Sequence, residues 1–530
     1  MTVRRALLIV LTMLLLASLA CNLAREQVIE ITATPDLIAA GGQVPGDPTG
    51  ALVPTPNLAR TLPTQAPQRD DNTYVVQGGD TFNVIASRYG IEPEELRTLN
   101  PDLPDANVLE LGDILNVPDM NIAAGPYLKL IPDSELVYSP AASDFSVAEF
   151  LADRESYLST YSERSSYDDQ VRSGPEIITT VATNYSVNPR LLLALLEYRG
   201  GWLSQPQASS SAERYPFGLV DDGLQGLEDQ TIAMANALNQ GYYAWKYRGD
   251  IPVQPMVLSD GTRLVLDATL NPGTIGVQYA LGIYNTYERW QTDVSATGFY
   301  QTYVSLFGNP FAYTIDPLVP RDLQQPDLTL PFAPGEIWRY SGGPHGGYNT
   351  GSAWAAIDFA PPDLPDDYPV TSSCYLSPYA VIASAPGVVV RSADGQVVLD
   401  LDGDGNEHTG WTLLYMHVDQ QNRVQVGDQL QTGDRIGQPS CEGGFSNGTH
   451  LHFARRYNGE WIPAECTDCA PDVTAPPFVL SGWVVAKLPG QPYAEYQGTI
   501  TNLALAAADP YYEASIAEAS RLEDINLVSW

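Results

Sequence analysis

The spacing of apolar residues along this 530-residue chain changes near residue 326. Between residues 135 and 325, apolar side chains recur at the three- and four-residue spacing of amphipathic helices. After residue 326 they occur in short runs bounded by Gly and Pro, as in antiparallel sheets. The clearest helical segments are 175–185, 190–198, 233–243 and 277–284, and the clearest strands are 381–390, 396–401, 411–417 and 448–456. The pattern predicts an α-helical domain over 135–325, an antiparallel all-β domain over 326–505 and a C-terminal extension over 506–530.

The chain begins with a short basic segment and an apolar stretch over 6–17, which is too short to span a membrane comfortably. The stretch ends in SLAC at Cys21, which resembles a bacterial lipobox with Ser where that motif usually has Leu. The resemblance implies that residues 1–21 are a lipoprotein signal peptide and that lipidated Cys21 anchors an extracytoplasmic protein to the cell membrane. An ordinary signal peptide cut just before Cys21 is the alternative. Both interpretations predict export, which permits disulfides.

Residues 22–72 predict a linker, and the overall charge limits the possible partners of the protein. The segment is rich in Thr, Pro, Ala and Gly, a composition that buries no core and predicts an extended linker. The whole chain carries 63 acidic and 27 basic residues, a formal charge of −36. A surface this negative repels nucleic acid and anionic lipid head groups, so neither is expected as a partner.

Residues 74–118 carry the residue pattern of a small carbohydrate-binding module. The segment resembles a LysM domain, for which we take the boundaries 73–119, and the resemblance implies a βααβ fold. It also implies binding to the N-acetylglucosamine-containing glycan of peptidoglycan, although such a domain can serve only as a spacer. The matching residues are Tyr74, Val75, Val76, Gly79, Asp80, Thr81, Ile85, Ala86, Tyr89, Gly90, Ile91, Leu96, Asn100, Pro101, Leu111, Gly112, Leu115, Val117 and Pro118.

One segment of the helical domain, 188–202, resembles the helix that carries the catalytic glutamate of lytic transglycosylases. Arg199 and Gly200 stand where that family has Glu and Ser. A guanidinium stays protonated and cannot act as the acid, and Glu197 is about 200° away around the helix. We therefore expect either a degenerate lysozyme-like domain or an unrelated helical core, acting as a spacer or a glycan-docking domain rather than as a second enzyme.

All five histidines fall in the all-β domain, and four of them lie within three short motifs. His345 lies in GGPHGG and Asp358 follows in AAIDF. His417 ends LYMH, and GTHLHF contains both His450 and His452. Because side chains alternate along a strand, His450 and His452 lie on one face, about 7 Å apart at their Cα atoms. One ring can then bind a metal while the other reaches a substrate.

These motifs resemble the lysostaphin-type zinc metallopeptidases, and in particular the β-lytic endopeptidase/staphylolysin branch. That branch has a glycine-rich segment with a His some thirteen residues before the Asp, as His345 and Asp358 have. The resemblance implies that His345, Asp358 and His452 bind Zn2+ and that His417 and His450 are the catalytic pair. It implies hydrolysis of the peptide part of bacterial peptidoglycan. A thermolysin-type site is excluded, because the chain contains no His-Glu-x-x-His.

The remaining cysteines and two polar features are less specific. Cys374 and Cys441 resemble the pair that forms a disulfide in the β-lytic branch, whereas Cys466 and Cys469 fit either a tight disulfide loop or half of a zinc knuckle. The segment 400–405 copies the start of an EF-hand loop but lacks its last Glu, so we expect a solvated hairpin. We expect His408 to be solvated in the same hairpin and Tyr415 to be a packed aromatic. Further weak candidates for a group that stabilises the transition state are Tyr493 and Tyr496.

Three functions fit the sequence. The leading one is a zinc metalloendopeptidase that hydrolyses peptide bonds of peptidoglycan at the cell surface. The second is a catalytically silent wall-binding or regulatory lipoprotein, in which the peptidase fold is only a docking surface. The third is a broader secreted metallopeptidase that cleaves proteins.

Overall fold

The computed structural model describes three folded parts of the chain. The described residues are 73–76, 82–88, 93–101, 103, 109, 113–117, 122–124, 127–248, 256–363, 374–466, 469, 473, 475–487, 498–502 and 527–530. The expected signal peptide, the linker, and Tyr493 and Tyr496 lie outside them. Within these ranges, no helix is long and apolar enough to cross a membrane.

The N-terminal module has the predicted βααβ order. It consists of β1 (Thr73–Val75), α2 (Phe82–Arg88), α3 (Pro93–Leu99) and β2 (Ile114–Asn116), and β1 pairs antiparallel with β2. The helices contribute Phe82, Ile85 and Leu96 to a small core that includes Leu115 of β2. The Asn100 amide donates to the Asn116 carbonyl at 2.7 Å and accepts from the Asn116 N–H at 2.6 Å. This pair of hydrogen bonds joins the end of α3 to β2.

The middle domain is helical, as the apolar spacing predicts. Its α-helices are α4 (Asp133–Leu136), α5 (Val147–Leu151), α6 (Tyr157–Thr160), α7 (Gly174–Tyr185), α8 (Pro189–Gly200), α9 (Ser210–Arg214), α10 (Leu227–Tyr243), α11 (Pro272–Gly282), α12 (Tyr287–Asp293) and α13 (Phe299–Phe307). Short elements join them, namely η1 (Pro140–Ala142), η2 (Ala244–Arg248), η3 (Pro310–Tyr313), β3 (Ile122–Ala124), β4 (Ser162–Arg164), β5 (Val171–Ser173), β6 (Met256–Val257) and β7 (Arg263–Val265).

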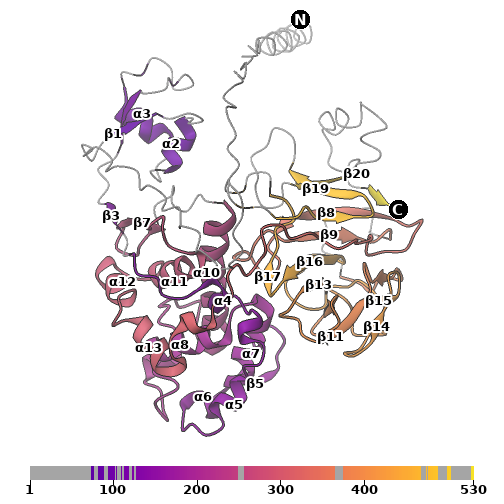
Figure 1. Ribbon diagram of the computed structural model, residues 1–530, viewed down its shortest axis with the longest axis horizontal. Coiled ribbons are helices and arrows are strands. Elements are labelled where there is room, and N and C mark those ends of the chain that lie inside the picture. The colour runs from indigo at the N-terminus through magenta and orange to yellow at the C-terminus, as the bar shows by residue number, and fades with distance from the viewer. Residues whose placement is uncertain are drawn as a thin grey trace, which may run out of the picture. The chain divides into compact units, whose positions relative to one another are not determined.

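Local signals in the sequence fix the ends of the long helices. Ser173 and Glu176 form a capping box at the start of α7, each satisfying a backbone N–H of the other. The Asn188 side chain caps α8, and Gly201 ends α8 in the left-handed conformation with φ +66°. In Figure 1 the helices of this domain run from purple to pink along the chain, and the strands that follow run on from pink to orange and yellow.

Two residues of α8 that the sequence singled out have structural partners. The Arg199 guanidinium lies 2.7 Å from the Asp293 carboxylate, and both side chains are buried. Glu197 instead accepts hydrogen bonds from the N–H groups of Leu203 (2.7 Å) and Ser204 (3.2 Å), beyond the end of the helix. The two side chains therefore have different partners: Arg199 pairs with Asp293, and Glu197 accepts hydrogen bonds from the backbone that follows the helix.

The C-terminal domain is built on antiparallel strands. The largest sheet among the described residues has nine strands in the order β14-β11-β12-β13-β16-β9-β8-β21, with β17 paired to β16. Its strands are β8 (Ile337–His345), β9 (Ala356–Ala360), β11 (Gly387–Ala393), β12 (Gln396–Asp400), β13 (Trp411–Met416), β14 (Gln429–Leu430), β16 (Leu451–Tyr457), β17 (Glu460–Trp461) and β21 (Leu527–Ser529). Smaller sheets contain β10 (Val381–Ile382), β15 (Arg435–Gly437), β18 (Val479–Leu480), β19 (Trp483–Lys487) and β20 (Gly498–Asn502). β21 belongs to the expected C-terminal extension, which therefore contributes an edge strand to the sheet.

Both faces of the central strands are buried. Val397, Leu413 and Phe453 pack into a core within the β domain. Their neighbours in sequence, including Val398 and Leu414, belong to the same apolar cluster as the helices of the middle domain. Burial on both faces explains why these strands read as continuous apolar runs instead of alternating with polar residues.

Polar contacts also join the helical domain to the β domain. The buried Glu460 carboxylate accepts hydrogen bonds from Tyr242 (3.0 Å), Tyr247 (2.6 Å) and Lys246 (2.7 Å). Separately, the Ser186 hydroxyl donates to the Gly459 carbonyl at 2.6 Å. A buried carboxylate with three donors is costly to separate from them, so the two domains pack as one unit.

The expected solvated hairpin between β12 and β13 is wrong at two residues. His408 is buried, and its ring stacks on Tyr138 of the helical domain at a centroid distance of 3.6 Å. The Asp400 side chain is also buried, and it accepts hydrogen bonds from three backbone N–H groups of its own turn. Tyr138 of the helical domain covers His408, which the local sequence could not indicate, whereas residues 402–405 at the tip are exposed as expected.

Candidate metal centre

Three neighbouring strands bring His345, Asp358 and His452 together. Asp358 of β9 lies directly opposite His452 of β16, and opposite Gly342 of β8 on its other side. The β8–β9 register shifts between Gly342 and His345, so the glycine-rich run bulges and places His345 beside Asp358. Gly343 has φ +121°, and a Cβ there would approach the Ala356 carbonyl oxygen to 2.9 Å. Glycine is therefore required at this position of the bulge.

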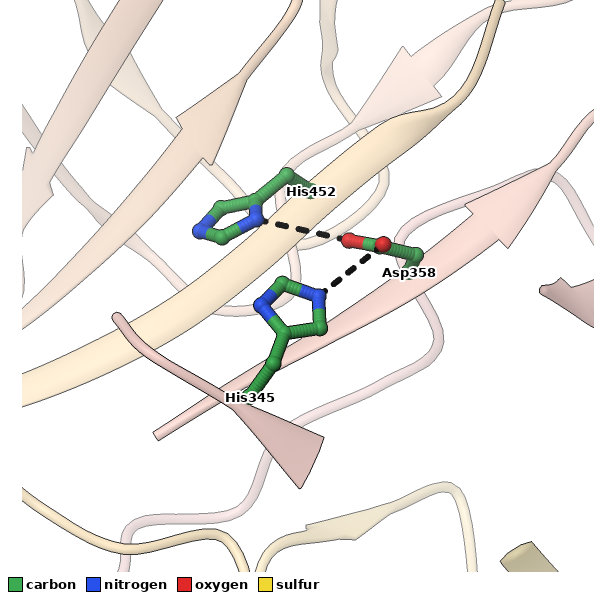
Figure 2. Close-up of side chains that lie close together, drawn as sticks. All are labelled: His345, Asp358 and His452. Atoms are coloured by element: carbon green, nitrogen blue, oxygen red, sulfur yellow. Dashed lines mark ion pairs between the residues drawn. The ribbon is translucent and has the colours of Figure 1, made fainter. Parts of the chain in front are cut away.

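The donor atoms of this trio fit a tetrahedral zinc ion. His345 Nε2 lies 2.9 Å from Asp358 Oδ2, and His452 Nδ1 lies 3.4 Å from Asp358 Oδ1, as Figure 2 shows. One donor atom from each residue lies within 4.8 Å of the others. Ligands about 2.1 Å from a tetrahedral zinc are roughly 3.4 Å apart, close to these separations. Two imidazoles and a carboxylate are a usual catalytic donor set, which leaves the fourth position for water or substrate.

Backbone carbonyl groups orient both imidazoles. His345 Nδ1 lies 3.2 Å from the Gly346 carbonyl oxygen, and His452 Nε2 lies 3.0 Å from that of Gly347. A ring nitrogen that donates to a carbonyl fixes the tautomer, so the opposite nitrogen presents its lone pair. In both residues that opposite nitrogen is the one nearest Asp358.

The charge states also suit metal binding. Burial raises the pKa of Asp358, but the neighbouring His345 and His450 outweigh it and hold the pKa well below its usual range. Burial lowers the pKa of His452, which keeps its imidazole neutral. Metal ligands must be deprotonated, and a carboxylate with a neutral imidazole meets that condition.

His417 and His450 lie beside the trio. Their ring centroids are 4.5 Å apart, and His450 Nε2 is 3.7 Å from Asp358 Oδ2. His417 follows β13 with φ +66°, a conformation that is rare outside glycine and asparagine and concentrated at functional sites. The Ser440 N–H donates to the His417 carbonyl at 2.7 Å, and Ser440 also bridges to His450. One backbone segment thus positions both rings.

Each ring of this pair presents its Nε2 atom to the site. His417 Nδ1 lies 3.1 Å from the Glu442 carbonyl oxygen, and His450 Nδ1 lies 2.7 Å from that of Gly448. Burial, together with His450 and His452, lowers the pKa of His417 to about 3. His417 is therefore a neutral imidazole near pH 7 and can accept a proton at Nε2.

All five residues line one cavity of about 260 Å³. Phe445, Ser446 and Asn447 line it as well, and the Phe445 side chain is 92% exposed. Sequence reasoning missed this segment. The two glycines before Phe445, both with positive φ, were the available signal, because they allow the chain to turn sharply beside His417.

The cysteines pair as expected. Cys374 and Cys441 form a disulfide, and Cys441 directly follows the Ser440 that holds His417 and His450. Cys466 and Cys469 form a second disulfide, so the alternative of a zinc knuckle does not apply to them. Tyr415 is a buried, packed aromatic whose hydroxyl accepts the Ser384 N–H at 2.8 Å.

Comparison with known proteins identifies the domains of this chain. The model of peptidase family M23 matches residues 376–463, which include His417, His450 and His452. The β domain is a family M23 peptidase domain. A LysM domain model matches residues 74–118, and a model described as the LasA N-terminal domain matches residues 129–319 of the helical domain. The M23 match begins after His345 and Asp358, so the assignment of those two residues depends on the geometry of the strands.

Among curated proteins, the chain is similar to Protease LasA from two strains of Pseudomonas aeruginosa. It is 28% identical to each over 305 residues, which cover 54% of this chain and 67% of the relative. Similar solved structures include the deep-sea M23 metalloprotease pseudoalterin. The two are 20% identical, the match covers 34% of this chain and 92% of that chain, and the TM-score is 0.24. Another is the catalytic domain of lysostaphin from Staphylococcus simulans. It is 28% identical, the match covers 23% of this chain and 80% of that chain, and the TM-score is 0.17.

These matches confirm the LysM domain, the peptidase domain and the enzyme class expected from the sequence, whereas the LasA-type helical domain was not predicted. The chain is a zinc metallopeptidase with an M23 domain, a LysM domain and a LasA-type helical domain. LysM and M23 domains together point to the bacterial cell wall.

Proposed function

We propose that this protein is a zinc metalloendopeptidase that hydrolyses peptide bonds of bacterial peptidoglycan outside the cytoplasm. In this proposal His345, Asp358 and His452 hold the metal, while His417 and His450 act on the substrate. The observation that supports it most strongly is the cavity in which the three clustered donor atoms face two further imidazoles. Structural sites bury all of their ligands, whereas a catalytic site needs such an open cavity.

The chain's own residues divide the chemistry between them. When bound, zinc polarises the scissile carbonyl group and lowers the pKa of water toward neutrality. Neutral His417 accepts a proton at Nε2 from the attacking water, since its Nδ1 is fixed on the Glu442 carbonyl. His450, whose Nδ1 donates to the Gly448 carbonyl, would carry a second proton at Nε2 as the imidazolium, and this N–H would donate to the developing oxyanion. One of the two rings returns the proton to the leaving amine.

The other domains favour peptidoglycan as the substrate. The LysM domain would hold the glycan strand near the active site, which raises the local concentration of the peptide stems. The lipobox-like Cys21 and residues 22–72 would tether the enzyme to the membrane surface while allowing reach into the wall. Replacing Cys21 with Ser should then release the protein from the membrane fraction.

A broader protein-cleaving activity is the second candidate, because the relative similar over 54% of this chain is called a protease. The helical domain is not proposed as a second enzyme. The Arg199 side chain that stands in the position of a transglycosylase acid is engaged by Asp293. We therefore expect no anhydromuropeptide products from this protein.

The test combines metal analysis with mapping of the products. Purified cell walls are incubated with the zinc-loaded full chain, with the metal-free chain and with His450→Ala. We expect loss of turbidity and new amino termini within stem or cross-bridge peptides with the zinc-loaded chain alone. New reducing sugar ends without new amino termini would contradict the proposal. Cleavage of casein with no cleavage of walls would favour the broader protease.

A further inference from the structure

The loop between β8 and β9 controls the orientation of two proposed zinc ligands. We call residues 346–352 the ligand loop. The carbonyl groups of Gly346 and Gly347 lie at its start, and they hold the rings of His345 and His452. Movement of this loop would therefore turn both imidazoles away from Asp358.

The composition of the ligand loop gives it little intrinsic rigidity. Three of its seven residues are glycines, which are free to adopt many backbone conformations when nothing holds them. Asn349 has φ +62°, a conformation that costs energy for residues with a side chain unless contacts support it. Hydrogen bonds between the Ser352 hydroxyl and the backbone of Tyr348 and Asn349 close the loop on itself, but they do not fix its position relative to the strands.

The contacts that fix it come from the helical domain. Asn236, in the middle of α10, accepts the Gly351 N–H on Oδ1 at 2.7 Å and donates to the Thr350 hydroxyl at 3.4 Å. Tyr185, the last residue of α7, accepts the Asn349 side-chain amide on its hydroxyl at 2.8 Å. Its ring also packs edge-on against Tyr348 at a centroid distance of 5.0 Å.

The backbone of the ligand loop is tightly packed near both of its ends. A Cβ on Gly351 would lie 2.1 Å from the Asn236 carbonyl oxygen, and a Cβ on Gly347 would lie 2.3 Å from the Trp461 ring. The Trp461 indole N–H in turn donates to the Tyr185 carbonyl at 3.3 Å, which also accepts the Asn239 side-chain amide at 2.8 Å. The helical domain and Trp461 thus enclose the loop from both ends.

We propose that Tyr185 and Asn236 of the helical domain are positioning residues of the metal site, acting through the ligand loop. Neither residue lines the cavity, whose lining residues all belong to the β domain. Without them the loop would have to be ordered when the metal binds, and that entropy cost would weaken the affinity for zinc. The inference depends on the proposed metal ligands but not on the identity of the substrate.

The experiment compares zinc affinity among variants of the full chain. Tyr185→Phe removes only the hydroxyl that holds Asn349, and Asn236→Ala removes the acceptor of Gly351. Tyr242→Phe is the matched control, because it also removes one hydroxyl from the contact between domains but leaves Glu460 its Tyr247 and Lys246 partners.

Zinc dissociation constants are measured by competition with a chelator, and the melting temperature of each metal-free variant is recorded. We expect Tyr185→Phe and Asn236→Ala each to raise the dissociation constant about tenfold, the lower end for groups that orient ligands. Tyr242→Phe should stay within twofold of the parent. Dissociation constants within twofold of the control in both variants would overturn the inference. A parent chain that binds no zinc would instead contradict the proposed metal site, whatever its action on walls.

Discussion

The two histidines of the His-Leu-His strand should fail in different ways when each is replaced by Ala. His452 Nδ1 is one of the three clustered donor atoms, so His452→Ala leaves two ligands. Catalytic zinc sites normally use three protein ligands, so a site with only two should lose its zinc during dialysis. His450 Nε2 is 3.7 Å from Asp358 Oδ2, and its Nδ1 is occupied by the Gly448 carbonyl. His450→Ala should therefore keep the metal and lose the chemistry.

The expected magnitudes follow from these positions. A positioned acid–base or oxyanion-stabilising group contributes about a hundredfold or more to turnover, equivalent to about 2.7 kcal/mol of activation free energy. We expect His450→Ala to retain nearly one zinc per chain and to lose about a hundredfold in kcat. His417→Ala should behave similarly, because His417 pairs with His450 at a centroid distance of 4.5 Å.

The assay measures zinc per chain by mass spectrometry after dialysis and kcat on purified walls, with circular dichroism as the check on folding. His452→Ala should lose both zinc and activity. If His450→Ala loses zinc while His452→Ala keeps it, the division between ligand and catalytic residue is inverted. If both variants keep zinc, the donor set must lie elsewhere.

Three further predictions concern the surroundings of the site. Replacing Cys374 and Cys441 together with Ser should lower the free energy of unfolding by about 4 kcal/mol, the chain-entropy value for a 67-residue separation; denaturant curves that coincide with the parent's would contradict this. Burial lowers the pKa of His408 to about 4, so the unfolded state takes up its proton first and about 3 kcal/mol of stability should disappear as the pH falls from about 6.5 to 4. His408→Gln should flatten this part of the pH–stability profile, and an unchanged slope would refute the assignment. Phe445→Ala should raise the KM for wall fragments several-fold at unchanged zinc content, because the exposed ring lines the cavity; an unchanged KM would exclude substrate contact.

The sequence predicted those parts of the site that depend on local periodicity and motif. Strand alternation placed His450 and His452 on one face, and the structure brings both into the same cavity. The glycine-rich run around His345 served only as a motif in the sequence, and the shift in register that it makes beside Asp358 was not predicted. The ligand and catalytic roles of the five residues stay predictions until they are measured.

Apart from the Phe445 segment, the features that sequence reasoning missed depend on contacts between distant segments. His408 was expected to be solvated because it lies in a polar hairpin, but Tyr138 covers it from 270 positions earlier in the chain. The contacts of Tyr185 and Asn236 with the ligand loop likewise join different domains. The strand β21 pairs with β8 across nearly the whole β domain, and nothing in its short sequence indicates that partner. Such contacts are set by tertiary packing, which local patterns do not specify.

The most direct test of the account is the position of zinc in a crystal of the zinc-loaded full chain. Anomalous diffraction collected on either side of the zinc absorption edge locates the ion without reference to the protein chemistry. The account predicts one strong peak about 2.1 Å from His345 Nε2, His452 Nδ1 and an Asp358 oxygen. A zinc peak at Asp400, Asp402 and Asp404, the other cluster of potential ligands in the described part of the chain, with none beside Asp358, would contradict it.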